Sequence, residues 1–209
     1  MPLDERAPSV ERDDVDGRTA RRDRNRIAVL DAVLELFSEG DLAPSAERVA
    51  QRSGVSLRSV YRYVADSEDL TRAAIERHLE RVGHLFSIPA IGEGARDERI
   101  ERFVAARLAL YEAIAPTARA SRLRAPTSAP IREQLERGRR LLRAQVERHF
   151  APELDVLDDR VRSAVLAAID ALTQIETIDL YRVHGGHSSS ETHELFVIAV
   201  ARLLAHSAP

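Results

Sequence analysis

The segment GVSLRSVYRYV, from Gly54 to Val64, concentrates hydrogen-bond donors on a short stretch of helix. Leu57, Val60 and Val64 recur at spacings of three and four residues, which predicts one apolar face that packs against a core. The remaining positions carry side chains that can donate to another molecule: Ser56, Arg58, Ser59, Tyr61, Arg62 and Tyr63. This pattern favours a helix that binds a partner and does not serve packing alone.

The elements before this segment would hold it in place. Ile27, Leu30, Leu34 and Phe37 recur at helical spacing, which predicts an amphipathic helix ending near Gly40. The segment DLAPSAERVAQRSG then predicts a short helix capped by Ser45 and ending near Arg52, with half of a capping box. Gly54 would supply the positive φ of a turn, and Ser56 would cap the next helix. Helix, short helix, glycine turn and short helix is the order of a helix-turn-helix motif.

A helix in this position can enter the major groove of DNA, where residues near its start meet base edges. We expect Arg58 to contact a base, since a guanidinium bonds guanine through two hydrogen bonds. Leu57 would lie between groove and core. The hydroxyls of Tyr61 and Tyr63 would reach phosphates, as would Ser45 at a helix N-terminus.

Local charge agrees with a polyanionic partner. The whole chain has a net charge of −3, but residues 18–64 carry nine arginines against six acidic residues. Five of these arginines lie within nine residues, at Arg18, Arg21, Arg22, Arg24 and Arg26. The alternative is that the arginines simply solvate a helical surface.

The segment RIAVLDAVLELFSEG, followed by SAERVAQRSGVSLRSVYRYVADSEDL, resembles the DNA-binding domain of the tetracycline-repressor (TetR) family. The similarity runs from Ile27 to Leu70. It includes the aliphatic first helix with Phe37, the SGVS turn and the VYRY helix. It implies an all-helical homodimeric regulator whose two heads read a palindromic operator in double-stranded DNA, and whose bodies bind a small-molecule effector. It also implies DNA-facing positions at Ser45, Ser56, Tyr61 and Tyr63.

The chain departs from the family pattern at two positions. Val64 stands where the family usually has phenylalanine, which thins the core of the head. Ser67 stands where the family usually has lysine, so a phosphate contact at the start of the fourth helix is weaker. Arg22 and Arg24, ahead of Ile27, are the residues we expect to compensate.

The remaining chain predicts an all-α protein with a helical-bundle body. An apolar fraction of 44% with only 4% aromatic residues, and no alternating β-branched run, disfavours a sheet. We expect a disordered tail over 1–17, a helix-turn-helix domain over 18–70 with a connecting helix to about 87, and a ligand-binding and dimerisation domain over 88–209. Body helices are expected at about 97–115, 117–124, 130–150, 158–183 and 189–205.

The last two helices, 158–183 and 189–205, are apolar around most of their circumference. A helix of this kind is buried on more than one side. We therefore expect them to pair with their copies in a four-helix dimer interface. The alternative is that both lie at the centre of a monomer.

An effector cavity would be lined by the helices that start near 97, 130 and 158. Its polar candidates, chosen by position only, are Tyr111, His149, Thr173 and Gln174. Each could instead lie at the surface or make an ordinary core hydrogen bond.

The sequence gives little indication of metal binding, cofactor binding, catalysis or membrane insertion. His184, His187 and His193 match no closed zinc-site spacing, and the chain has no cysteine, so we expect no metal. No phosphate-binding glycine loop or hydrolase motif occurs, so we expect neither a cofactor nor enzyme activity. No apolar run reaches the roughly 18 residues that span a bilayer, which predicts a cytoplasmic protein. Two functions remain open: a DNA-binding regulator, more often a repressor than an activator, or a helical dimer without DNA function that acts as an enzyme or interaction scaffold.

Overall fold

The computed structural model describes the backbone of residues 10–205 and side chains from Thr19 onward. Throughout these residues the regular structure is helical, with no β-strand. The chain divides into two compact units, 1–77 and 78–209, with the division inside the predicted connecting helix. Within residues 10–205 no helix combines the length and the apolar character that crossing a bilayer requires.

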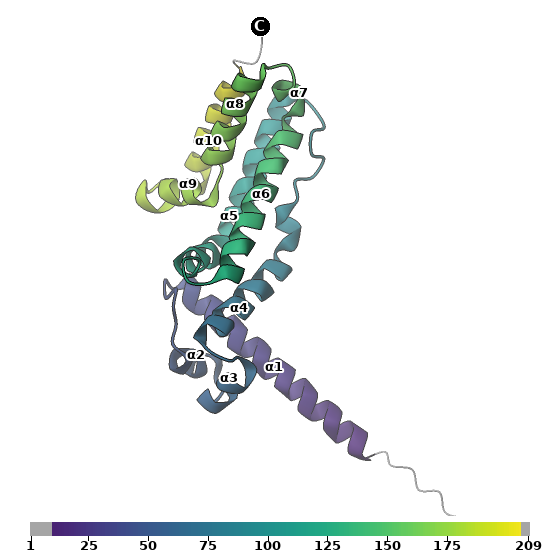
Figure 1. The fold of residues 1–209 in the computed structure, drawn as a ribbon, viewed down its shortest axis with the longest axis vertical. Helices are drawn as coiled ribbons and strands as arrows, with labels where there is room; N and C mark the ends of the chain where they lie inside the picture. Colours follow the sequence, from purple (N-terminus) through teal and green to yellow (C-terminus); the bar gives the residue numbers. More distant parts are fainter. Residues whose placement is uncertain (1–9, 206–209) are drawn as a thin grey trace, which may run out of the picture. The chain divides into compact units, whose positions relative to one another are not determined.

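The first unit, the head, is built on α1 (Val10–Ser38), against which α2 (Ala46–Ser53) and α3 (Leu57–Tyr63) pack near its C-terminal end (Figure 1). The first part of α4 (Ser67–Arg81) completes it. Side chains from all four helices form its core, each at most 1% exposed: Val29, Val33, Leu36, Phe37, Val49, Val60, Leu70, Ala74 and Ile75. On the edge of this core Arg77 donates to Asp31 at 3.0 Å and ties α4 to α1.

The helix α1 differs from expectation at its N-terminal end. It begins at Val10, so residues 10–17, expected to be disordered, are helical, while residues 1–9 lie outside the described range. No proline interrupts the chain between residues 10 and 38, which lets the helix continue. Ile27, expected in the packed stripe, is 42% exposed. The helix extends beyond the part that α2 and α3 cover (Figure 1), and burial begins only at Val29.

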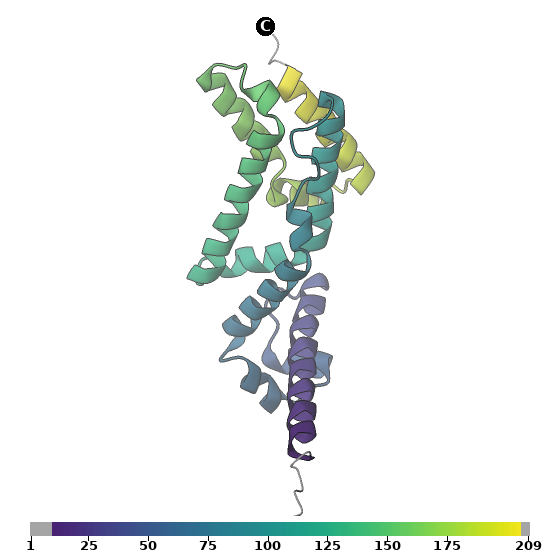
Figure 2. The same ribbon diagram turned by 90° about the vertical axis from the view of Figure 1, so that its right-hand side faces the viewer.

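The second unit, the body, begins with the end of α4 and a short 3₁₀ turn, η1 (Gly83–Phe86). Its helices are α5 (Arg96–Arg124), α6 (Ala129–His149), α7 (Ala151–Leu154), α8 (Asp159–Leu172), α9 (Ile175–Asp179) and α10 (Ser189–Ala205), with a π-helical turn, η2 (Leu180–His184), after α9. The two long helices α5 and α6 contact one another and diverge toward the bend of α5 (Figure 2). Phe103, Val146, Ile169, Phe196 and Val200 join them to α8 and α10 in one apolar core.

One long helix replaces two expected pieces in α5. The expected helices 97–115 and 117–124 form a continuous helix that contains Pro116. Proline removes one backbone hydrogen bond and bends a helix without necessarily ending it. Figure 2 shows the C-terminal part of α5 turning away from the direction of its first part. Burial of Ala115, Thr117 and Ala118 on both sides of the proline holds the bent helix in place.

The expected helix 158–183 is instead broken after Leu172. Thr173 closes α8 by donating its hydroxyl to the carbonyl of Ile169 at 2.8 Å. Gln174 then adopts an extended backbone with ψ of 151°, and α9 starts anew. A threonine that bonds its own preceding turn competes with helix continuation. The connecting helix, expected to reach about 87, ends at Arg81 and is followed by η1. The expected reciprocal cap of α10 is confirmed: Ser188 and Glu191 form it, with bonds of 2.7 and 3.1 Å.

Candidate nucleic-acid interface and body cavity

The turn between α2 and α3 has the geometry that the sequence predicts. Ser45 caps α2 by accepting the amide of Arg48 at 3.3 Å, and Ser56 caps α3 by accepting the amide of Ser59 at 3.3 Å. Between them Gly54 has φ of 67°, in the left-handed region that glycine tolerates best. Val55, 8% exposed, anchors the turn in the core. The start of α3 is therefore fixed at both its backbone and its cap.

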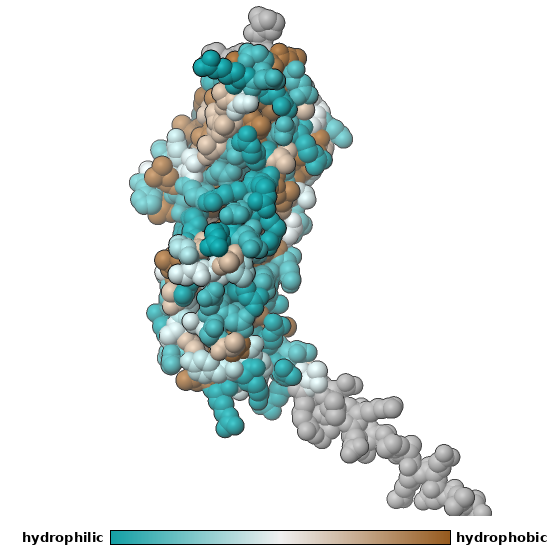
Figure 3. All heavy atoms as spheres, viewed as in Figure 1, coloured by the Kyte–Doolittle hydropathy of each residue, from teal (hydrophilic) through white to brown (hydrophobic). Residues whose placement is uncertain are grey.

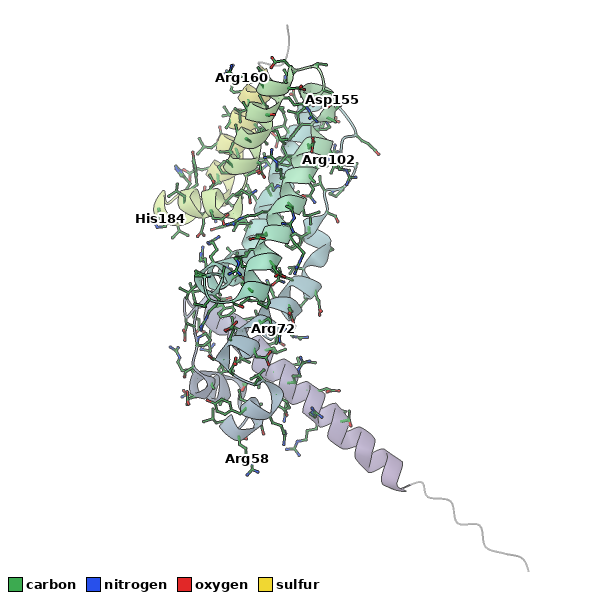
Figure 4. All side chains as sticks on the ribbon, viewed as in Figure 1. Arg58, Arg72, Arg102, Asp155, Arg160 and His184 are labelled. Carbon is green, nitrogen blue, oxygen red and sulfur yellow. The ribbon has the colours of Figure 1, made fainter. Side chains whose placement is uncertain are left out.

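The helix α3 presents two different faces. Val60 is fully buried and Val64 is 6% exposed, so they hold the helix against the core of the head. Arg58, Tyr61 and Arg62 are exposed on the other side, Tyr61 at 52%. In Figure 4 the labelled Arg58 side chain extends away from α3 into solvent. Leu57, Ser59 and Tyr63 are partly buried between the two faces, whereas Ser56 and Ser67 are exposed.

Ion pairing separates the arginines of the head into two groups. Arg48 pairs with Asp41 at 3.0 Å, Arg52 with Glu39 at 2.7 Å and Arg72 with Glu76 at 2.9 Å. Among the residues that the structure describes, Arg58 has no carboxylate within ion-pair distance. The charge of Arg58 is thus free for a partner, while the charges of the paired group are already matched inside the protein.

The exposed end of α3 and the middle of α1 together line a surface hollow. Its residues are Arg21, Arg22, Asn25, Ser59, Arg62 and Tyr63. The guanidinium of Arg62 lies over the ring of Tyr63 at 5.4 Å and donates to its hydroxyl at 3.3 Å. Arg24 is exposed but does not line this hollow. The hollow gathers three arginines from two helices, which makes it a local positive surface.

Sequence reasoning missed Arg21 and Asn25 as members of this surface. A signal was present, because residues 21 and 25 are four apart and share one face of a helix with residue 22 nearby. This spacing is informative only because α1 continues through residues 21–25.

The body contains a small cavity of about 80 Å³. It lies among the end of α4, η1, the bent end of α5, the first half of α6 and the start of α9. Its apolar wall consists of Leu79, Phe86, Ile114, Ala118, Leu135, Leu142 and Ile175, and its polar lining of Thr117, Ser121, Arg122, Gln134, Arg139, Gln174 and Glu176, with Gly138 between them.

Buried hydrogen bonds hold the elements that form the wall of the cavity. Arg107, 2% exposed, donates to the carbonyl of Leu142 at 2.7 Å and to the side chain of Gln145 at 2.6 Å. Gln145 in turn donates to the carbonyl of Phe86. Burial lowers the pKa of Arg107 to about 10, partly offset by the charge of Asp170, so the group is still cationic at neutral pH. These bonds hold α6 and η1 on either side of the cavity.

Of the four expected effector contacts, the structure brings only Gln174 to the cavity lining. Tyr111 donates to Asp179 at 2.9 Å, and Thr173 uses its hydroxyl to close α8. His149 is fully buried: its Nδ1 accepts the amide of Gly92 at 3.1 Å, and its Nε2 lies 2.9 Å from the carbonyl of Arg99. Because Nδ1 accepts, Nε2 carries the proton, and burial lowers the pKa of this neutral ring.

A network of charges lies at the edge of the cavity. Glu176 on α9 pairs with Arg139 of α6 at 2.6 Å and with Arg122 of α5 at 3.7 Å. Asp179 accepts from Arg119 at 3.0 Å and from Arg122 at 3.3 Å. Burial raises the pKa of both carboxyls, but hydrogen bonds from the arginines outweigh it and leave both values lowered. Three arginines thus face two carboxylates.

Solved structures share this architecture over most of the chain. A TetR-family transcriptional regulator from Streptomyces coelicolor aligns with a TM-score of 0.67 and 21% identity, over 89% of this chain and 82% of that one. The fold is TetR-like. A transcriptional regulator from Rhodococcus sp. RHA1 aligns at 0.65 with 16% identity, over 88% and 96% of the two chains. A TetR/AcrR-family regulator from Aquifex aeolicus VF5 aligns at 0.58 with 19% identity, over 86% and 99%.

The resemblance seen in the first helices therefore extends through the body, and the all-α class with a helix-turn-helix head and helical body is confirmed. In sequence, no protein-family model and no curated protein matches the chain significantly. At these identities the likeness establishes the TetR-like fold, and what the chain does has to be argued from its own residues.

Proposed function

We propose that the protein is a transcriptional regulator that binds DNA through α3 of a homodimer and responds to a small molecule in its body. The observation that carries this proposal is the exposed face of α3. Arg58 and Tyr61 stand there without an internal partner among the described residues, on a helix anchored by Val60 and capped by Ser56.

The chemistry of this face suits both parts of DNA recognition. Arg58 would bond a guanine in the major groove, while Tyr61 and the hollow with Arg21, Arg22 and Arg62 would contact phosphates. Arg24 and the exposed cap serines, Ser45 and Ser56, would add further backbone contacts. The likeness to three solved transcriptional regulators supports the same function.

Surface apolar residues in the last third of the body support a homodimer. Val161 of α8 and Leu195 and Ile198 of α10 are 39%, 41% and 52% exposed. Figure 3 shows apolar side chains on the surface where α8 and α10 lie. Large exposed aliphatic side chains on neighbouring helices are typical of an association surface. We propose that these helices pair with their copies and bring two heads to one palindrome.

The experiment that tests this function is selection of random duplex DNA by the purified protein, followed by sequencing of the retained molecules. The proposal expects an inverted repeat whose half-sites lie about one helical turn apart or a multiple of it. The protein is also tested after unfolding and refolding without ligand, so that a bound effector does not mask DNA binding. Recovery of no sequence above background by folded, refolded dimer would contradict the proposal and favour a helical dimer without DNA function.

A further inference from the structure

The cavity of the body combines an apolar interior with a cationic edge. Seven of its lining side chains are aliphatic or aromatic, and they come from α4, η1, α5, α6 and α9. Its charged lining residues are Arg122, Arg139 and Glu176. A guest that fills such a space would place its hydrocarbon part inside and its polar group at the edge.

The charges at this edge do not balance. Arg119, Arg122 and Arg139 face Glu176 and Asp179, and the two carboxylates are shared among the three guanidinium groups. Within this network of five groups, positive charge therefore exceeds negative charge by one. An anionic guest compensates this excess positive charge. A neutral guest leaves the excess unchanged, and a cationic guest increases it.

Arginine also selects the kind of anion. Its planar guanidinium can match the two oxygens of a carboxylate, and at present Arg139 makes one such bond, to a single oxygen of Glu176 at 2.6 Å. Glu176 thus occupies a position on Arg139 that the carboxylate of a guest could take.

We propose that the effector is a small amphipathic carboxylate, with an aliphatic body among Phe86, Ile114 and Leu142 and its carboxylate on Arg122 and Arg139. This inference rests on the proposed function, because it names the ligand class of the regulator. The carboxylate of the guest supplies the missing negative charge and shares Arg122 and Arg139 with Glu176. The two ion pairs of Glu176 then weaken, while Asp179 still joins α9 to Arg119 of α5, so that ligand entry and movement at the start of α9 are one event.

The size of the cavity supports this coupling. Its volume of about 80 Å³ is below the roughly 300–1,000 Å³ of typical small-molecule pockets. A guest must therefore widen it, and movement of the start of α9 at Glu176 is the change that its charge would trigger. Gly138 leaves space at the wall, since a Cβ built there meets no atom within 4 Å.

Direct binding tests the inference without DNA. Octanoate, 1-octanol and octylamine share one tail and differ in head group, and each is titrated into the purified full-length protein by calorimetry. We expect octanoate to bind at least about tenfold more tightly than either of the others, since a charge-assisted contact to arginine is worth a factor of this size. Equal or tighter binding of octanol or octylamine, or no binding of any of the three, overturns the inference.

Two variants assign the binding to this cavity. Arg139→Gln should lower octanoate affinity about tenfold, to that of octanol, and leave octanol binding unchanged. Gly138→Leu should fill the cavity and weaken octanoate and octanol alike. The matched control is Arg137→Gln on the same helix, whose side chain is 62% exposed and whose one ion pair among the described residues is with Glu133 at 3.9 Å. If Arg137→Gln loses as much octanoate affinity as Arg139→Gln, the assigned site is wrong.

The outcome is separable from that of the proposed function. A protein that selects a palindrome but does not distinguish octanoate from octanol keeps the regulator function and loses the carboxylate effector. A protein that binds octanoate selectively but selects no DNA keeps the site and loses the function.

Discussion

Arg58 and Arg139 illustrate what a single arginine can do in this chain, depending on its neighbours. Arg58 has no carboxylate partner among the described residues and is exposed on α3, whereas Arg139 is held by Glu176 at 2.6 Å. All 31 cationic residues are arginines, so residue type alone does not distinguish an arginine with a carboxylate partner from one without. The position of Arg58 near the start of the second helix of the motif predicted its proposed role. The proposed role of Arg122 and Arg139 was not predictable, since α4, η1, α5, α6 and α9 must meet to create their cavity.

Tyr61 tests the phosphate contacts of α3. Its side chain is 52% exposed, so Tyr61→Phe removes only a hydroxyl and leaves the fold intact. We expect binding to weaken to all duplexes alike, because phosphates carry no sequence information. Fluorescence anisotropy with matched and mismatched duplexes measures it. A variant that weakens the matched duplex alone would instead assign Tyr61 to a base.

His149 makes stability depend on pH. Burial, together with nearby arginines, lowers its pKa below the ordinary value, although its bond to the carbonyl of Arg99 opposes this. Below about pH 6.5 the unfolded chain takes up a proton at this position that the folded chain does not. The free energy of unfolding therefore falls as pH decreases from about 7 toward 5.

Thermal unfolding between pH 5 and 7.5 measures this dependence. His149→Gln keeps a donor and an acceptor but does not titrate, so its melting temperature should vary less with pH than that of the wild type. The control is His84→Gln, at an exposed position of η1. An unchanged pH slope in His149→Gln would show that another group is responsible.

At the scale of elements, the turn between α2 and α3 depends on a backbone conformation that glycine adopts most readily. Gly54 has φ of 67°, and a Cβ there meets no atom within 4 Å, so only backbone strain opposes a side chain. We expect Gly54→Ala to cost about 1–2 kcal/mol of unfolding free energy. Gly138→Ala, inside α6, should instead stabilise by roughly 0.5–1 kcal/mol. Urea denaturation compares the two, and equal effects would contradict the argument.

Helix existence was predictable from apolar spacing, but several ends were not. Pro116 normally ends a helix, yet buried Ala115 and Thr117 on either side carry α5 through a bend. The apolar pattern continues past Thr173, yet its bond to Ile169 ends α8. Tertiary packing in the first case, and a local side-chain bond in the second, outweigh the pattern that the sequence displays.

At the scale of the whole molecule, the proposed dimer determines whether two copies of α3 can reach one operator. Ile198, 52% exposed on α10, is central to the proposed interface. Ile198→Asp places a charge where the two copies would meet, and burying that charge unpaired is costly. We expect a folded monomer by sedimentation velocity at micromolar concentration, with loss of tight palindrome binding.

Val156 supplies the matched control for this substitution. It is 68% exposed and lies between α7 and α8, outside the proposed interface. Val156→Asp should remain dimeric. A dimeric Ile198→Asp, or a monomeric wild type, would contradict the pairing of the last helices.

If α3 reads bases through Arg58, the ratio of dissociation constants for a selected operator and its single-base mismatches measures this contact directly. In Arg58→Ala the free-energy difference that corresponds to this ratio should fall by roughly 1–3 kcal/mol at one position of each half-site. Arg72→Ala, whose guanidinium is paired with Asp69 and Glu76, should leave the ratio unchanged. Full retention of discrimination by Arg58→Ala would show that Arg58 contacts no base.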